Sequence, residues 1–147
     1  MRFLHLTKRE RLALMLLAAT YLFNWGLVFS GAYKSLPVID WPMHFLGGFL
    51  IAYFFLDIIR EALIAQRPLW KDLLLIVGVS LIVGVLWEFM EFAITNMAGT
   101  YFAERLHQEC CIGSLADTLK DLIMDSLGAT TLFFAFRHTH RKDKMFR

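Results

Sequence analysis

Residues 73–98 read LLLIVGVSLIVGVLWEFMEFAITNMA, a run of 26 residues in which Glu88 and Glu91 are the only charged side chains. A helix needs about 20 consecutive apolar residues to cross the hydrocarbon core of a bilayer. The stretch is therefore long enough to span a membrane, and it carries two acids in its second half. An apolar span that contains acids recurs elsewhere in the chain.

Three further stretches have a similar character. Residues 12–33 contain no charge, residues 41–59 contain His44 and Asp57, and residues 116–137 carry most of their charges in the first half. Lipid-exposed segments must satisfy their own backbone hydrogen bonds, and four segments are too few to close a β-barrel. The sequence therefore predicts an all-α, polytopic membrane protein. We expect a bundle of four transmembrane helices over about 12–33, 41–59, 72–97 and 116–137.

The composition supports this prediction. Of the 147 residues, 58% are hydrophobic and 19% are charged, whereas soluble domains have about 45–50% apolar and about 25% charged residues. The length fits a single domain over residues 1–147. The first apolar stretch follows basic residues, as in a signal peptide, but it is too long for one and no small-residue cleavage site follows, which favours a retained helix.

The distribution of Lys and Arg predicts the orientation. Twelve of the 15 lie before the first predicted helix, between the second and third, or from Arg137 onward. Basic residues concentrate in cytoplasmic loops, so both termini are expected in the cytoplasm of a bacterial inner membrane. The basic tail fits a contact with anionic lipid. No nucleic-acid partner is expected, and nothing in the sequence indicates an oligomer.

This orientation brings ionisable residues from three predicted helices to the extracytoplasmic half of the bundle. They are Asp40, His44, Glu88, Glu91, Asp117, Asp121 and Asp125. Within each helix the spacing is three or four residues, so each helix presents one polar face. Small residues near these faces, such as Gly48, Gly84 and Gly128, permit close helix approach.

Structural roles explain some of these residues. Asp40 precedes Pro42 and could cap its helix, and Ser114 with Asp117 fits a capping box. A lone His44 could be a satisfied polar residue. The acids Glu88, Glu91, Asp121 and Asp125 have no capping role available. So many carboxylates in a membrane must share protons, meet water or hold a cation.

Carboxylates with one imidazole in a helical frame suit a divalent metal, and oxygen-rich ligation favours Mg²⁺, Ca²⁺ or Mn²⁺. We expect Asp40, Glu88, Glu91, Asp121 and Asp125 as metal ligands. We expect His44, Glu88 and Asp121 as catalytic residues, with His44 as a general base. The pair Cys110–Cys111 has no spacing typical of a metal site, and an oxidised pair or two buried thiols are both open interpretations.

Three segments carry a family resemblance. IDWPMHFLGG at 39–48, GVLWEFME at 84–91 and DTLKDLIMDSLGA at 117–129 resemble the YjdF-like inner-membrane proteins. More distantly they are similar to VanZ-like proteins, which share an Asp-x-x-x-His helix, a Glu-bearing helix and an Asp-bearing helix. VanZ-like proteins are grouped with enzymes that process lipid head groups. The resemblance implies chemistry at a lipid phosphate, with Asp40, His44, Glu88, Glu91, Asp121 and Asp125 as active-site residues.

The sequence thus predicts a metal-assisted enzyme, a hydrolase or transferase, acting on a phosphate-bearing membrane lipid at the extracytoplasmic face. A small proton- or cation-coupled transporter or ion-binding protein is the alternative, since intramembrane acids also carry protons and cations. A structural subunit with a buried polar network is a third. The restriction of the acids to one membrane half favours the enzyme, because a transporter site is expected near the midplane.

Overall fold

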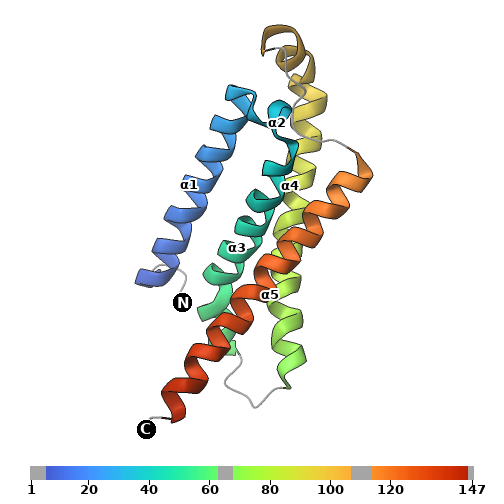
Figure 1. The fold of residues 1–147 in the computed structure, drawn as a ribbon. Helices are drawn as coiled ribbons and strands as arrows, with labels where there is room; N and C mark the ends of the chain where they lie inside the picture. The colour runs from blue at the N-terminus through green and yellow to red at the C-terminus, as the bar shows by residue number, and fades with distance from the viewer. Residues whose placement is uncertain (1–5, 63–67, 107–113, 146–147) are drawn as a thin grey trace.

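The computed structural model describes residues 6–62, 68–106 and 114–145, and in these ranges it contains helices and short connections without a strand. Four long helices lie side by side (Figure 1): α1 (Lys8–Ser30), α3 (Asp40–Ala62), α4 (Leu69–Leu106) and α5 (Leu115–Met145). The short helix α2 (Ala32–Ser35) and the 3-10 helix η1 (Pro37–Ile39) connect α1 to α3. The prediction of an all-helical fold is confirmed.

Capping residues set the limits of α1. The Thr7 hydroxyl accepts a hydrogen bond from the Glu10 backbone N–H at 3.1 Å, and the Glu10 carboxylate accepts one from the Thr7 N–H at 2.6 Å. This capping box starts the helix at Lys8, four residues before the predicted start. Gly31 ends it with a left-handed φ of 75°. The predicted helix to residue 33 was therefore too long, because hydropathy does not detect the turn at Gly31.

The other helices also extend beyond their predicted limits. Helix α3 continues to Ala62 rather than 59, and α5 continues to Met145 rather than 137. Helix α4 runs from Leu69 to Leu106, well past the predicted end at 97. Its 38 residues make it about 57 Å long, against a hydrocarbon core of about 30 Å. One end of α4 therefore projects beyond the region that lipid tails can cover.

Within the described residues, three helical stretches are long and apolar enough to cross a membrane, namely Lys8–Ser30, Pro37–Leu56 and Leu69–Glu104. Helix α5 does not reach the same apolarity, because Asp117, Lys120, Asp121 and Asp125 lie in its first half. The chain is therefore a membrane protein with several apolar helices. Apolarity alone does not make α5 a fourth span.

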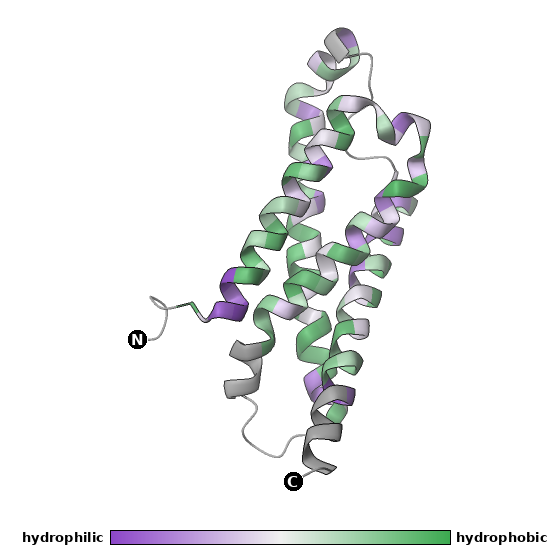
Figure 2. Ribbon diagram, turned by 60° about the vertical axis from the view of Figure 1, so that its left-hand side comes forward, coloured by the Kyte–Doolittle hydropathy of each residue, from purple (hydrophilic) through white to green (hydrophobic). Residues whose placement is uncertain are grey.

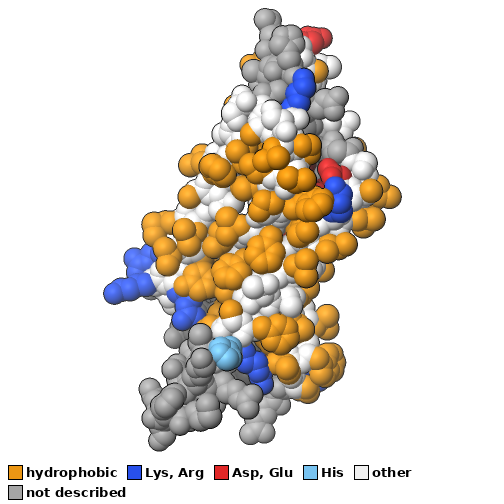
Figure 3. All heavy atoms as spheres, in the orientation of Figure 1, with side chains coloured by type: hydrophobic (Ala, Val, Ile, Leu, Met, Phe, Trp, Pro, Cys, Tyr) orange, Lys and Arg blue, Asp and Glu red, His pale blue; other side chains and the backbone are white. Residues whose placement is uncertain are grey.

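The molecular surface is apolar where a soluble protein would be polar. Hydrophobic residues follow the middle of the helices, while hydrophilic ones lie mainly toward their ends and on inward faces (Figure 2). Large exposed side chains occur on α1, α4 and α5, including Leu22, Ile82, Phe89 and Ile123. The space-filling view shows a broad hydrophobic band with Lys and Arg at its margins (Figure 3). Such a surface is expected against lipid tails.

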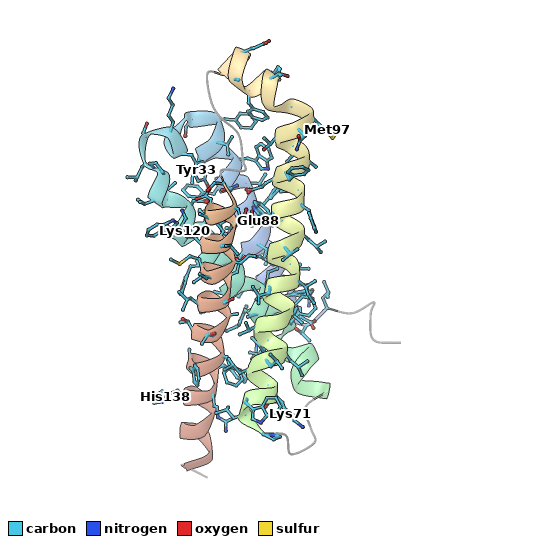
Figure 4. All side chains as sticks on the ribbon, turned by 90° about the vertical axis from the view of Figure 1, so that its right-hand side faces the viewer. Tyr33, Lys71, Glu88, Met97, Lys120 and His138 are labelled. Atoms are coloured by element: carbon cyan, nitrogen blue, oxygen red, sulfur yellow. The ribbon has the colours of Figure 1, made fainter. Side chains whose placement is uncertain are left out.

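The two ends of the bundle differ. Helix α1 begins and α5 ends at the same end (Figure 1). Lys71 and His138 also lie at this end, whereas Tyr33, Glu88 and Lys120 lie in the opposite half (Figure 4). The alternating directions of α1, α3, α4 and α5 thus agree with the predicted helix order. A small apolar core that includes Leu56, Ile76 and Phe133 fills the half near the termini.

Candidate functional site

The site is assembled around His44, in the second turn of α3. The Nε2 atom of His44 lies 3.8 Å from Asp40 Oδ1 and 4.0 Å from Glu88 Oε1. Its Nδ1 atom lies 3.6 Å from Asp125 Oδ2. One imidazole therefore faces carboxylates from α3, α4 and α5. Because Asp40 and His44 are four residues apart, they share one face of α3 and enter the site together.

Glycines hold α5 close enough for Asp125 to reach His44. A Cβ atom on Gly48 would collide with the backbone of Asp125, and one on Gly128 would collide with the backbone of Phe45. A Cβ atom on Gly84 would collide with the Asp125 carboxylate itself. The Asp125 side chain is thus seated among backbone atoms of α3 and α4. Small residues allow this close approach of helices, as the sequence predicted.

The charged groups of the site are removed from solvent and lipid. His44 and Glu88 are each 7% exposed, Asp121 is 3% exposed and Asp125 is 5% exposed. Three buried oxygens, Glu88 Oε1, Asp121 Oδ1 and Asp125 Oδ2, have no hydrogen-bond partner among the described residues. A buried carboxylate oxygen without a partner is costly. These oxygens therefore require a proton, a water molecule or a cation.

The geometry suits a single ion. Asp40, His44 and Asp121 each offer one ligand atom, and the three atoms lie within 4.8 Å of one another. Two oxygens bound to one Ca²⁺ at about 2.4 Å lie at most about 4.8 Å apart. The Asp121 oxygen that lacks a partner belongs to this group of side chains. Carboxylates and imidazole are accepted by Mg²⁺, Ca²⁺, Mn²⁺ and Zn²⁺.

Glu91, a predicted ligand, has a different environment. Its Oε1 atom accepts a hydrogen bond of 2.8 Å from the Nε1 of Trp87, one turn earlier on α4. It is only partly buried, one turn beyond Glu88 toward the end of the bundle that carries η1. Of the predicted ligands, Glu88 and Asp125 face the imidazole of His44, and Asp40 and Asp121 complete the three-residue group.

The two residues with possible capping roles, Asp40 and Asp117, have different structural roles. Asp40 has helical angles, φ −64° and ψ −42°, and is the first residue of α3, so it is not the non-helical residue that an N-cap requires. The Asp117 N–H donates to Ser114 Oγ at 3.3 Å, which is half of a capping box. The Asp117 carboxylate accepts a hydrogen bond from Lys120 Nζ at 2.6 Å. Asp117 thus has a structural role at the start of α5, near the surface.

Sequence reasoning missed one group that contacts the site and another that lies near it. Thr118 Oγ1 donates a 2.8 Å hydrogen bond to Glu88 Oε2, which leaves Oε1 facing His44. Tyr33, on α2, donates its phenolic hydrogen to Asn24 Oδ1. Burial raises the pKa of the Tyr33 phenol above its usual range, and the charges of Asp40, Glu91 and Asp121 raise it further. Tyr33 is therefore a neutral donor beside the acids. The turn signal at Gly31 could have directed attention to it.

Asn24 and Trp25 also have partners. Asn24 contacts α2 through Tyr33, and Trp25 stacks on Phe102 of α4 with ring centroids 6.3 Å apart. The pair Cys110–Cys111 lies outside the described residues.

A cavity of about 420 Å³ adjoins the site. It lies among α1, α3 and α4, and Asp125 is the residue that α5 contributes to its wall. Asp40 and His44 lie at one end, Asp125 lies beside Gly47 and Gly48, and apolar residues such as Leu14, Leu17 and Ile51 line the other end. The volume is within the range of ligand sites, about 300–1,000 Å³. The acids are therefore accessible from an apolar chamber.

The comparisons with known proteins give a family. A family model described as "Predicted membrane protein (DUF2238)" matches residues 3–142. An uncharacterized protein of Thermotoga maritima is 30% identical over 127 residues, which is 84% of this chain and 60% of the relative. The chain thus spans about three fifths of that relative's length. No solved structure matches this chain.

The resemblance to YjdF-like proteins agrees with this match, whereas the comparisons do not support the more distant likeness to VanZ-like proteins. Because the family model extends over nearly the whole sequence, the chain belongs to the DUF2238 family of predicted membrane proteins.

Proposed function

We propose that this protein is a metal-assisted membrane enzyme, a hydrolase or transferase, that acts on a phosphate-bearing lipid head group at the extracytoplasmic face. The observation that supports this most is the grouping of the partly buried Asp40 with the buried His44 and Asp121, in which one Asp121 oxygen has no hydrogen-bond partner. Neighbouring unpartnered oxygens on Glu88 and Asp125 add to the negative charge. A divalent cation would satisfy these oxygens and reverse the local charge.

Helix α5 is proposed as the fourth span. Its low apolarity comes partly from Asp121 and Asp125, which are buried against α3 and α4 and need not meet lipid. Its outward residues are apolar, including Leu119, Ile123, Leu127 and Phe134. An inward polar face on a helix with an apolar outer face is usual for functional intramembrane acids. Twelve of the 15 basic residues lie before the first predicted span, between the second and third, or from Arg137 onward, which supports termini in the cytoplasm of a bacterial inner membrane.

Asp125 has a supporting role in the proposed ion site. It faces the Nδ1 of His44, which leaves Nε2 on the side of Asp40 and Glu88. Histidines that bind metals commonly use one nitrogen for the ion and the other for a carboxylate. We therefore assign Asp40, His44 and Asp121 as the ligands of the ion. Asp125 fixes the ring, and Glu91 lies farther out with Trp87.

Glu88 is then the group best placed to move a proton. Its Oε2 is held by Thr118, and its Oε1 is free, 4.0 Å from His44 Nε2. In the proposed reaction, a water or alcohol oxygen attacks phosphorus while Glu88 accepts its proton. The bond from phosphorus to the leaving oxygen breaks, and the same proton passes to that oxygen. A bound divalent ion supplies charge stabilisation on the phosphate oxygens.

A transporter would need a route from the site to the cytoplasmic end. Toward that end, the cavity is lined by Leu14, Leu17, Ile51 and Val83, with Ser80 as a polar residue. The Ser80 hydroxyl donates to the Gly48 carbonyl at 2.9 Å, so its hydrogen is already used. No titratable side chain among the described lining residues continues the polar cluster in this direction. This supports chemistry at one face rather than transport.

The test is turnover by purified protein in bilayer discs that contain phosphate-bearing lipids with different head groups. We expect release or exchange of a head group that stops with a chelator, returns with Mg²⁺, Mn²⁺ or Ca²⁺, and is lost in His44→Ala. Asp117→Asn is the matched control, because Asp117 pairs with Lys120 outside the buried group. Proton- or cation-dependent flux in sealed vesicles without turnover would replace the enzyme proposal by the transporter.

A further inference from the structure

The cavity beside the acids has features of a site for a hydrocarbon chain. We propose that it holds a single alkyl chain of the same lipid whose phosphate is placed at Asp40, His44 and Asp121. This inference rests on the proposed function and adds the part of the substrate that the acids do not contact. One alkyl chain of the lipid would then move from the bilayer into the cavity before the reaction.

The shape of the cavity fits one chain. Its lining extends along α3 from Asp40 to Ile51 and along α1 from Asn24 to Leu14. At about 1.5 Å per residue these stretches are about 15 Å long. A volume of about 420 Å³ over this length leaves a cross-section of roughly 30 Å². Packed carbon atoms lie about 4 Å apart, so this section is wide enough for an extended chain.

The polarity of the lining changes along this length in the way that an amphiphile requires. The end near η1 carries Asp40, His44 and Asn24, and the other end carries Leu14, Leu17 and Ile51. A small polar solute would leave its hydrogen bonds unsatisfied in the apolar end. A hydrocarbon chain leaves no hydrogen bond unsatisfied there, and the head group attached to it would lie at the acids. The cavity therefore matches a chain joined to an anionic head.

A chain can reach the cavity from the bilayer. Helix α1 packs chiefly on α3. It meets α4 through aromatic rings, with Tyr21 5.8 Å from Trp87 and Trp25 6.3 Å from Phe102 between ring centroids. Tyr21 and Trp25 follow Leu14 and Ala18 along α1, so these ring pairs lie nearer the end of α1 that leads into α2. Below them, Leu14 and Ala18 are exposed although they line the cavity. The seam between α1 and α4 is thus the proposed entry.

Two pairs of neighbouring residues provide matched variants. Ala18 and Ala19 are both exposed on α1, and Ala18 lines the cavity whereas Ala19 does not. Val83 lines the cavity from α4, and Val85 is exposed on the same helix outside it. Phenylalanine at Ala18 or Val83 fills the chamber. Phenylalanine at Ala19 or Val85 adds the same bulk toward lipid. The second pair keeps the test valid if one filled variant does not fold.

The experiment measures chain position without needing turnover. The full-length protein, in bilayer discs, receives a lipid phosphate monoester whose acyl chain ends in a diazirine. After illumination, labelled peptides are mapped by mass spectrometry. We expect labelling at Leu14 and Ile51 that falls at least about fivefold in Ala18→Phe and Val83→Phe, because the phenyl ring would occupy the space that the chain needs. Ala19→Phe and Val85→Phe should label like the unmodified protein.

The outcomes separate this inference from the proposed function. Labelling confined to outward residues such as Phe89 and Ile123, or equal in filled and control variants, overturns the chain site. Turnover that persists with that pattern leaves the enzyme proposal standing without it. A neutral diacylglycerol with the same diazirine chain is the second arm. If it labels Leu14 and Ile51 as strongly as the phosphate lipid, the chain site stands and the phosphate head group is wrong.

Discussion

Asp125 Oδ2 lies 3.6 Å from His44 Nδ1, although 81 positions separate the two residues in the sequence. Both are buried, and the contact joins α5 to α3 where the two backbones are closest. Because the other nitrogen of His44 faces Asp40 and Glu88, this one relationship fixes the orientation of the ring. It depends on glycines that permit the approach, which makes the packing of the bundle a condition for the site.

Substitution of Gly48 by alanine should destabilise the protein. Its Cβ atom would collide with the backbone of Asp125, which cannot move away without displacing α5. We expect a loss of about 1–3 kcal/mol in the free energy of unfolding. Gly78→Ala is the control, because its Cβ atom meets nothing within 4 Å. It should be neutral or stabilise by about 0.5–1 kcal/mol, since alanine favours a helix. Denaturation in detergent measures both, and equal effects would contradict the close packing.

Metal binding should discriminate between three aspartates of α5. Asp121→Asn removes a proposed ligand and should abolish binding. Asp125→Asn weakens the support of His44 and should lower the affinity about 10–100-fold. Asp117→Asn should leave it unchanged, because Asp117 pairs with Lys120 instead. Mn²⁺ titration of the purified protein, followed by electron paramagnetic resonance, measures all three. The same affinity in all of them would exclude an ion at this site.

Glu88→Gln tests the proton acceptor separately from the ion. Glutamine keeps the size of the side chain and can still bond Thr118, but it cannot accept the proton of an attacking water. We expect turnover to fall by about 10²–10⁴-fold, with Mn²⁺ affinity and folding retained. Kinetics and the Mn²⁺ titration on the same preparation check this. Joint loss of both properties would instead make Glu88 a ligand, as the sequence also predicted.

Orientation can be tested without activity. Twelve of the 15 basic residues lie before the first predicted span, between the second and third, or from Arg137 onward, which predicts that the termini are cytoplasmic. A reporter fused after Arg147 should be active only as a cytoplasmic reporter. The same reporter inserted between residues 99 and 112 should report the opposite side. Two fusions on the same side would remove α5 as a span and place the acids in a different leaflet.

Asp117→Asn also has a stability prediction of its own. Asparagine retains the backbone hydrogen bond from its N–H to Ser114, and only the pair with Lys120 is lost. Exposed ion pairs contribute about 0–1 kcal/mol, so the change in unfolding free energy should be below about 1 kcal/mol. A thermal melt beside that of the unmodified protein checks this. A loss of several kcal/mol would mean that Asp117 belongs to the buried network.

The sequence by itself determined the helical class, the order of the long helices and which ionisable residues lie in the same half of the bundle. Apolar length predicts spans because lipid offers no hydrogen bonds to the backbone. Spacing of three or four residues placed Asp40 with His44 and Asp121 with Asp125 because such residues share a helix face. The count of four spans does not follow from apolarity alone. Acids lower the apolarity of α5 by the same amount whether they face the bundle or the lipid.

The tertiary structure decided which atoms face one another. Helix spacing does not show that Asp125 faces Nδ1 of His44, or that Glu91 turns to Trp87 and leaves Glu88 beside the imidazole. The rotation of each helix about its axis sets these contacts. That rotation is fixed by where Gly48, Gly84 and Gly128 let backbones meet. The cavity beside α1 has the same origin, because it is the space left where α1 packs on α3 and meets α4 through aromatic rings.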